Sequence, residues 1–154
     1  MAPLDGIRVL DLTRLLPGGF CTQLMADFGA DVIKVEDTGA GDYIRMAPPY
    51  HEVEGDETST RSGLYLSLNR SKRSIRLDLK SDAGQEAFMR LVGGADVVME
   101  GFRPGVAERL GIDFESLSSV NPGIVYCSIS GYGQTGPNRD RAGHDINYLA
   151  ATGM

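Results

Sequence analysis

The chain has 154 residues, of which 42% are hydrophobic, and a formal net charge of −6 at pH 7. This length suits one domain, and the hydrophobic fraction can supply its core. The acidic balance argues against binding to nucleic acid or to an anionic membrane, so an anionic ligand would need a local cluster of basic side chains. No apolar stretch is long enough to cross a membrane.

The start of the chain and its cysteines predict a cytoplasmic location. The first residues, MAPLDGIRVLDL, lack a charged segment followed by an apolar one, so we expect no signal peptide. Cys21 and Cys127 lie far apart in apolar surroundings, as expected for reduced thiols in the core of a cytosolic protein.

The first part of the chain predicts a strand, a helix and a second strand. These elements are GIRVLDL (6–12), PGGFCTQLMADFG (17–29) and ADVIKVE (30–36). Phe20, Leu24 and Phe28 share one face of the helix, and Gly29 suits its C-terminal cap. A strand, a helix and a strand within about thirty residues predict a βαβ unit with a parallel sheet.

A long loop is predicted next, because residues 37–63 contain several Gly, Pro and acidic residues and show no clear period. Strands and helices then alternate again. The predicted strands are 74–81, 96–102 and 123–130, and the predicted helices are 82–95, 103–111 and 113–122. We expect Asp82 to cap its helix, Ala87, Phe88 and Leu91 to face inward, and Pro104 to occupy the first turn of the next helix.

The predicted fold class is therefore α/β, with a mostly parallel twisted sheet and flanking helices. Ligands of such sheets bind beyond the carboxyl ends of the strands. The segment after the first strand, DLTRLLPGG, lacks the glycine fingerprint of a dinucleotide site. Glu36, at the end of the second strand, could hold a ribose hydroxyl, although a solvated acid at a strand end is the commoner explanation.

Basic side chains cluster in the segment NRSKRSIRLDLK of this acidic chain, and two more follow a later strand. They are Arg70, Lys72, Arg73, Arg76, Lys80, Arg103 and Arg109. Guanidinium and ammonium groups bind phosphate through charge-assisted hydrogen bonds, so a phosphorylated ligand is favoured. A solvated strand face is the alternative interpretation of the first group.

His144 and Asp145 in GHDINY are the chemical candidates. An imidazole can take and return a proton near neutral pH, and a carboxylate can act as a nucleophile. The alternative is a helix N-terminus with Asp145 as its cap. The preceding glycine-rich SGYGQTGP either approaches a flat ligand closely or forms only a tight turn.

Five segments in order resemble the CaiB/BaiF family, the class III CoA-transferases. They are GADVIKVE, NRSKRSIRLDLKS, DVVMEGFRPGVAERLGI, NPGIVYCSISGYGQTGP and AGHDINYLAATG. The resemblance implies a Rossmann-like, coenzyme A-binding fold. With the basic cluster, it predicts coenzyme A contacts at Arg70, Lys72, Arg73, Leu77, Leu79, Lys80, Glu100, Gly101, Phe102, Arg103, Arg109 and Tyr148. No metal is expected, and no cofactor other than the coenzyme A of the substrate.

Within that family, AGHDINY is similar to the α-methylacyl-CoA racemase branch. The resemblance then implies that His144 is the base that removes the α-proton of a 2-methylacyl-CoA thioester. The segment VEDTGAGDYIR is instead typical of transferases, in which Asp145 would carry the acyl group as an anhydride. We expect a racemase, with a CoA-transferase and a non-catalytic coenzyme A-binding domain as alternatives.

The resemblance also implies a domain organisation. Residues 1–154 would form the N-terminal part of the large coenzyme A-binding domain, without the family's second domain. The family further implies an interlocked homodimer that acts on an acyl-CoA substrate.

Overall fold

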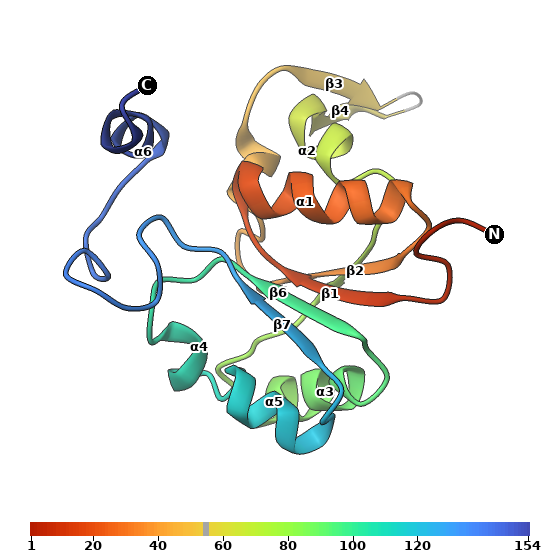
Figure 1. Ribbon diagram of the computed structural model, residues 1–154. Coiled ribbons are helices and arrows are strands. Elements are labelled where there is room, and N and C mark those ends of the chain that lie inside the picture. Colours follow the sequence, from red (N-terminus) through yellow and green to blue (C-terminus); the bar gives the residue numbers. More distant parts are fainter. Residues whose placement is uncertain (54–55) are drawn as a thin grey trace.

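The computed structural model describes residues 1–53 and 56–154 and shows a five-stranded sheet with helices on both faces (Figure 1). The strands are β1 (Arg8–Leu12), β2 (Asp31–Glu36), β5 (Arg73–Arg76), β6 (Val97–Glu100) and β7 (Val125–Ser128). They lie in the order β5-β2-β1-β6-β7, and every neighbouring pair is parallel. The predicted α/β class with a parallel sheet is confirmed.

The helices are divided between the two faces of the sheet (Figure 1). One face carries α1 (Leu15–Asp27) and α2 (Gly63–Leu68), and the other carries α3 (Asp82–Val92), α4 (Val106–Arg109) and α5 (Phe114–Val120). The last helix, α6 (Asp145–Thr152), stands apart from the sheet. No helix in the described ranges is both long and apolar enough to cross a membrane.

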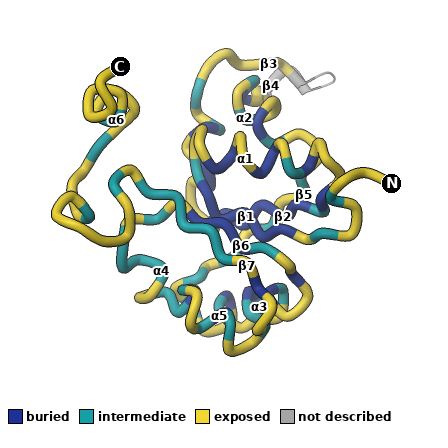
Figure 2. Tube along the Cα trace, in the orientation of Figure 1, coloured by how far each residue is buried: buried dark blue, intermediate teal, exposed yellow. Residues whose placement is uncertain are grey.

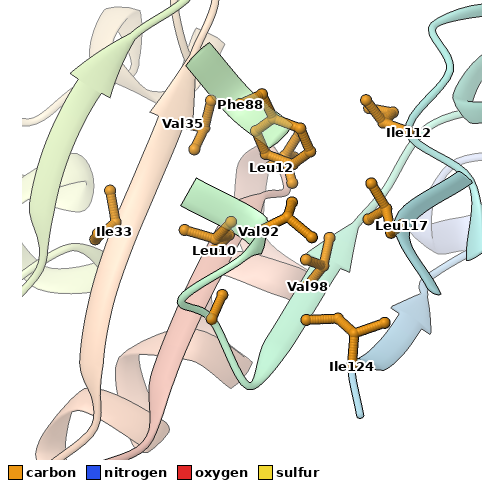
Figure 3. Packing of buried hydrophobic residues seen from close by; sticks show 11 residues of the cluster. Leu10, Leu12, Ile33, Val35, Phe88, Val92, Val98, Ile112, Leu117 and Ile124 are labelled. Carbon is orange, nitrogen blue, oxygen red and sulfur yellow. The ribbon is translucent and has the colours of Figure 1, made fainter. Parts of the chain in front are cut away.

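The larger core lies between the sheet and the helices α3 and α5 (Figure 3). Leu10 and Val98 from neighbouring central strands meet Phe88 of α3 and Leu117 of α5, and all of them are buried. The inward position predicted for Phe88 is confirmed. Burial of large apolar side chains such as these supplies most of the free energy that favours folding.

Helix α1 packs against the sheet through the side opposite to the face that carries its regularly spaced large apolar residues. Phe20, Leu24 and Phe28 are exposed by 52%, 40% and 53%. The buried side consists mainly of small or polar residues, such as Gly18 and Thr22. A side chain at Gly18 would come within 2.2 Å of Thr13, so this glycine lets the helix lie close to the chain that leaves β1. The three large residues therefore mark a second, exposed face. Cys21 of this helix is also exposed, so its predicted place in the core is wrong.

The predicted loop at residues 37–63 contains regular structure. It holds a 3-10 helix, η1 (Tyr43–Met46), and an antiparallel hairpin of β3 (Tyr50–Val53) and β4 (Asp56–Ser62). The sequences of these strands, YHEV and DETSTRS, are mostly polar. They lack the alternation of apolar residues by which a strand is recognised, and this explains why the prediction was wrong.

Several element ends differ from the predictions. Ser81 rather than Asp82 caps α3, because its hydroxyl accepts a hydrogen bond from the N–H of Gly84 at 3.1 Å. Pro104 precedes α4, whose cap is Gly105 at a φ of +81°. The C-cap of α1 is Phe28, one residue before the predicted Gly29, whose φ of +99° lies in the left-handed region that favours glycine after a helix.

Two predicted strands end earlier than expected, and this has a consequence for ligand binding. The strand predicted at 74–81 ends at Arg76, and the strand predicted at 96–102 ends at Glu100. Residues 77–80 and 101–103 therefore lie in turns beyond the carboxyl ends of β5 and β6. This edge of a parallel sheet is where ligands bind.

Candidate functional site

A cavity of about 90 Å³ lies at the carboxyl ends of β1, β2, β5 and β6. Its lining consists of Leu12, Val35, Glu36, Asp37, Leu77, Asp78, Leu79, Lys80, Phe102 and Leu110. Four of the predicted contact residues, namely Leu77, Leu79, Lys80 and Phe102, thus meet at one place. The cavity lies beside the junction of β1 and β6, where the strand order of the sheet reverses and open α/β sheets form their ligand crevice.

One wall of the cavity is fixed by a set of contacts around Glu36. Its carboxylate accepts hydrogen bonds from Arg45 at 2.6 and 2.8 Å, from the N–H of Asp42 at 3.0 Å and from the hydroxyl of Ser74 at 2.8 Å. The hydroxyl of Tyr65 donates to the same carboxylate at 3.1 Å. Because these groups use the carboxylate, Glu36 is not free to hold a ribose hydroxyl, and it serves as a fixed part of the wall.

The same contacts determine the charge of Glu36. Burial alone would raise its pKa, but the hydrogen bonds from Arg45, Asp42 and Ser74 outweigh that effect and lower the pKa from 4.5 to about 2. The pKa of Arg45 is raised, chiefly by its hydrogen bond to Glu36. The pair is therefore charged throughout the physiological pH range.

We expect this carboxylate to make folding stability depend on acid. A depressed pKa stabilises the folded state above pH 4.5, and the stabilisation is lost as the pH falls toward about 2. The loss for Glu36 is on the order of 3 kcal/mol. Thermal unfolding of wild type and Glu36→Gln between about pH 6 and pH 2.5 checks this. The stability of Glu36→Gln should fall less steeply with decreasing pH than that of wild type, because the contribution of this carboxylate is absent. Glu86→Gln, at an exposed position, should keep the pH dependence of wild type. An unchanged dependence in Glu36→Gln would contradict the assignment.

Lys72 lies in a buried network and not on a ligand surface. Its side chain is 1% exposed, and its ammonium lies 3.1 Å from a carboxylate oxygen of Asp11. It also donates to Gly19, Thr22 and Asn69 at 2.7–3.0 Å. Burial is the main cause of a lowered pKa for this lysine, opposed by the charge of Asp11. The ammonium of Lys72 is therefore used by these buried contacts and is not presented to a ligand.

Arg70 and Arg73 lie at the opposite end of the sheet from the cavity. Arg73 is the first residue of β5 and contacts Asp31, the first residue of β2, at 2.6 Å. Arg70 contacts Asp27, the last residue of α1, at 2.5 Å. Because the strands are parallel, their first residues share the amino edge, whereas the cavity lies at the carboxyl edge. The structure thus separates these two arginines from the other predicted contacts.

Lys80, Arg103 and Arg109 are exposed beside the cavity. Lys80 lines it, Arg103 follows the lining residue Phe102, and Arg109 precedes the lining residue Leu110. Among the side chains that the structure describes, those of residues 1–52 and 60–154, no acidic group forms an ion pair with any of the three. They are the predicted basic residues that the fold leaves available to an anionic ligand at this edge.

Glu100 and Gly101 shape the turn after β6. Glu100 is 3% exposed, and its carboxylate accepts hydrogen bonds from the N–H of Phe102 at 2.6 Å and from the hydroxyl of Ser128. The side chain of Gln134 donates to that hydroxyl at 2.6 Å. Glu100 therefore joins the turn at Gly101–Phe102 to the glycine-rich segment after β7, and its own carboxylate is already used.

The buried charges of the two central strands were missed by the sequence analysis. Lys34 of β2 and Asp11 of β1 are 1% and 0% exposed. The ammonium of Lys34 lies 2.9 Å from Asp42 and donates to the backbone oxygen of Thr13 at 3.0 Å. A lysine within the otherwise apolar DVIKV and an aspartate within RVLDL were the available signals. This network holds the turn between β1 and α1 beside the cavity.

His144 and Asp145 lie at the N-terminus of α6, outside the cavity. His144 occupies the cap position, and its N–H donates to the side chain of Asn147 at 2.9 Å, whereas Asp145 is the first helical residue. The helix N-terminus of the alternative interpretation is therefore confirmed, but its cap is His144 and not Asp145. Both residues are exposed on a helix that stands away from the sheet (Figure 2).

Comparison with known proteins gives one consistent family. Residues 4–154 match CoA-transferase family III. The chain is 43% identical to the human succinyl-CoA:glutarate CoA-transferase, covering 99% of this chain and 33% of the relative. It is 48% identical to the succinate–glutarate CoA-transferase of Agrobacterium fabrum (99% and 38%) and 43% identical to the acetyl-CoA:oxalate CoA-transferase of Acetobacter aceti (99% and 37%). The chain thus spans about a third of the length of these relatives.

A solved structure agrees with these matches. The crystal structure of a CaiB/BaiF family protein from Brucella suis superposes with a TM-score of 0.91 at 44% identity, covering 99% of this chain and 39% of that one. The fold implied by the resemblance is therefore confirmed. The relatives are named as transferases, so they favour the transferase alternative over the racemase that we expected.

Proposed function

The chain belongs to CoA-transferase family III, and from this premise we propose that the protein moves coenzyme A from an acyl-CoA donor to a carboxylic acid. The observation that carries the proposal is the match of 99% of the chain, at 43–48% identity, to relatives whose names specify this transfer. Residues 1–154 would form the N-terminal part of the coenzyme A-binding domain.

The cavity supports a binding mode for the nucleotide end of coenzyme A. Its apolar lining, which includes Leu77, Leu79 and Phe102, suits a flat adenine ring. Lys80 lines it, Arg103 and Arg109 are the exposed sequence neighbours of lining residues, and all three can bind phosphates by charge-assisted hydrogen bonds.

Two of the three acidic side chains that line the cavity are paired with arginines, and the third is Asp78. Glu36 is paired with Arg45, and Asp37 is paired with Arg14 at 2.7 Å. These ion pairs reduce the repulsion that two carboxylates would otherwise exert on a phosphate group at the cavity. An acidic chain can thus still present a basic surface at this edge.

Asp145 is the proposed nucleophile. Its carboxylate oxygen attacks the thioester carbonyl, an aspartyl anhydride forms, and the coenzyme A thiolate leaves. The thiolate then attacks the aspartyl carbonyl, which releases the donor acid and leaves an aspartyl thioester. The carboxylate of the acceptor acid then attacks the aspartyl thioester, which forms a second anhydride and releases the thiolate again. The thiolate attacks the acceptor's carbonyl, which forms the new acyl-CoA and restores the carboxylate of Asp145.

A racemase is the second candidate, and His144 is the observation that favours it. An imidazole next to the nucleophile has an obvious task in removing an α-proton, and its exposure leaves it open to a substrate. In the transferase, His144 has no assigned chemical step. The transferase and the racemase therefore differ in whether Asp145 or the adjacent His144 reacts with the substrate.

The homodimer implied by the family resemblance also stays a proposal. Exposed apolar side chains on α1 and α6, such as Phe20, Phe28 and Ile146, are consistent with further contacts in the complete protein. Sedimentation of the complete gene product at several concentrations measures the assembly state, and a monomer at all of them would contradict the proposal.

The transfer is tested by incubating the complete gene product with succinyl-CoA and a panel of mono- and dicarboxylic acids. Mass spectrometry should detect the CoA thioester of at least one acceptor and an equal amount of released succinate. Release of free coenzyme A without any new thioester would show hydrolysis and would contradict the proposal.

We predict that Lys80→Ala and Arg103→Ala each weaken coenzyme A binding about tenfold to a hundredfold, because a charge-assisted hydrogen bond to phosphate is lost. Calorimetry at low and high salt measures this, and the slope of affinity against salt should decrease in both variants. Arg90→Ala is the matched control, since Arg90 is exposed on α3 and lies 3.8 Å from Glu86 of the same helix. Unchanged affinity in both test variants would remove these residues from the site.

A further inference from the structure

Tyr148 is the one residue of α6 that is not exposed. Its hydroxyl donates a hydrogen bond to the backbone oxygen of Gly143 at 2.7 Å. Its ring meets the ring of Tyr132 edge to face, with centroids 5.3 Å apart and an interplanar angle of 70°. Such aromatic pairs are favourable beyond the area that they bury. Tyr148 is therefore the main contact between α6 and the chain that leaves β7.

Two glycines make room for this tyrosine. A Cβ atom at Gly131 would lie 2.3–2.4 Å from ring and hydroxyl atoms of Tyr148. A Cβ atom at Gly143 would lie 2.8 Å from the Tyr148 ring and 3.0 Å from the Tyr132 hydroxyl. Real Cβ atoms do not come this close to a ring, so both positions require glycine while the tyrosines stay in place. The guanidinium of Arg141 lies over the Tyr132 ring at 5.8 Å.

These contacts flank the exposed candidate catalytic pair on both sides in the sequence. Gly143 directly precedes His144 and Asp145, and Tyr148 follows within the first turns of α6. The hydrogen bond from Tyr148 to Gly143 thus closes a short loop around the pair, and the contact with Gly131 joins this loop to the end of β7. The direction in which the N-terminus of α6 points is set by these two attachments.

We propose that Tyr132 and Tyr148 are positioning residues that hold the His144–Asp145 pair in its reacting orientation. Gly131 and Gly143, which lack side chains, leave room for the two rings. The inference rests on the proposed function, because it assigns a task relative to the reaction of Asp145. Neither tyrosine touches the reacting atoms in this scheme. A misplacement of the nucleophile of about 1 Å costs up to about a hundredfold in rate.

The test uses the complete gene product with Gly131→Ala, Tyr132→Leu and Tyr148→Phe. The first two displace or remove a ring and should lower kcat about tenfold to a hundredfold, whereas KM for the donor acyl-CoA should change little. Tyr148→Phe keeps the ring and loses one hydrogen bond, so its kcat should fall about threefold to tenfold. The matched control is Tyr50→Phe, because the Tyr50 hydroxyl also donates to a backbone oxygen, that of Met46 at 2.6 Å, on a distant hairpin.

The outcomes separate the positioning role from the proposed function. Wild-type kcat in all test variants would overturn the positioning role while the transfer itself still occurs. The positioning role would also be overturned if kcat and the thermal midpoint fell together in the test variants and fell to the same extent in Tyr50→Phe. The tyrosines would then have only a structural role. If wild type itself transfers no coenzyme A, the proposed function fails, and this is read from the wild-type assay alone.

Discussion

Asp145→Asn is expected to abolish transfer of coenzyme A, with kcat lower by a factor on the order of a thousand or more. Asparagine keeps the size and hydrogen-bonding shape of the side chain, so α6 should still form. Its amide cannot attack the thioester as a carboxylate does, so neither the anhydride nor the aspartyl thioester can arise. Steady-state kinetics of the complete gene product measure the effect.

A nearby carboxylate serves as the control for this change. Asp140 is exposed and contacts only its neighbour Arg139, at 2.9 Å, among its ion pairs in the described part of the chain. Asp140→Asn should therefore leave kcat within about twofold of wild type. If Asp145→Asn keeps a comparable activity, Asp145 is not the nucleophile.

Asp11→Ala is expected to lower the free energy of unfolding by about 3–5 kcal/mol, because it removes a carboxylate from a buried ion pair. Asp11 is fully buried and contacts Lys72 at 3.1 Å, and it accepts a hydrogen bond from Thr22 at 2.6 Å. Without it, the buried ammonium of Lys72 has no carboxylate in direct contact within the described residues. Urea unfolding of the complete gene product measures the change.

Two further variants make this prediction specific. Asp5→Asn, at an exposed position, should change the free energy of unfolding by less than about 0.5 kcal/mol. Asp11→Ala combined with Lys72→Met should cost less than the sum of the two single changes, because the second removes the charge that the first leaves without a partner. Strict additivity would show that the pair does not interact.

The sequence was sufficient for the order of the main strands and helices. β1, β2 and β6 are short apolar runs bounded by turn residues, and Phe88 lies on a clear helical face, so burial and periodicity agree there. The face of α1 could not be predicted from its large residues. Its contact with the sheet depends on the absence of a side chain at Gly18, and a hydrophobic pattern does not register that absence.

The sequence predicted those residues of the candidate site whose position depends on where a strand ends. It did not predict which basic residues are excluded from the site by their tertiary contacts. Leu77 and Phe102 lie toward the carboxyl ends of the strands predicted at 74–81 and 96–102, so their place at the carboxyl edge follows from the parallel sheet even though both strands end before them. Arg73 belongs to the same basic stretch as Lys80, but β5 begins at Arg73, so the strand separates the two along its length. Composition shows that charges cluster in the sequence and does not show which end of a strand they occupy.

If the carboxylate of Asp145 forms the acyl anhydride and then the thioester with coenzyme A, hydroxylamine should trap the activated carboxyl group on this residue. The complete gene product is incubated with succinyl-CoA, treated with hydroxylamine and digested, and the peptide that contains Asp145 is examined by mass spectrometry. The transferase account predicts a hydroxamate at Asp145, because hydroxylamine attacks the activated aspartyl carbonyl and releases coenzyme A. An unmodified Asp145, together with exchange of the α-hydrogen of a 2-methylacyl-CoA for deuterium that His144→Ala suppresses, would contradict it and would establish the racemase instead.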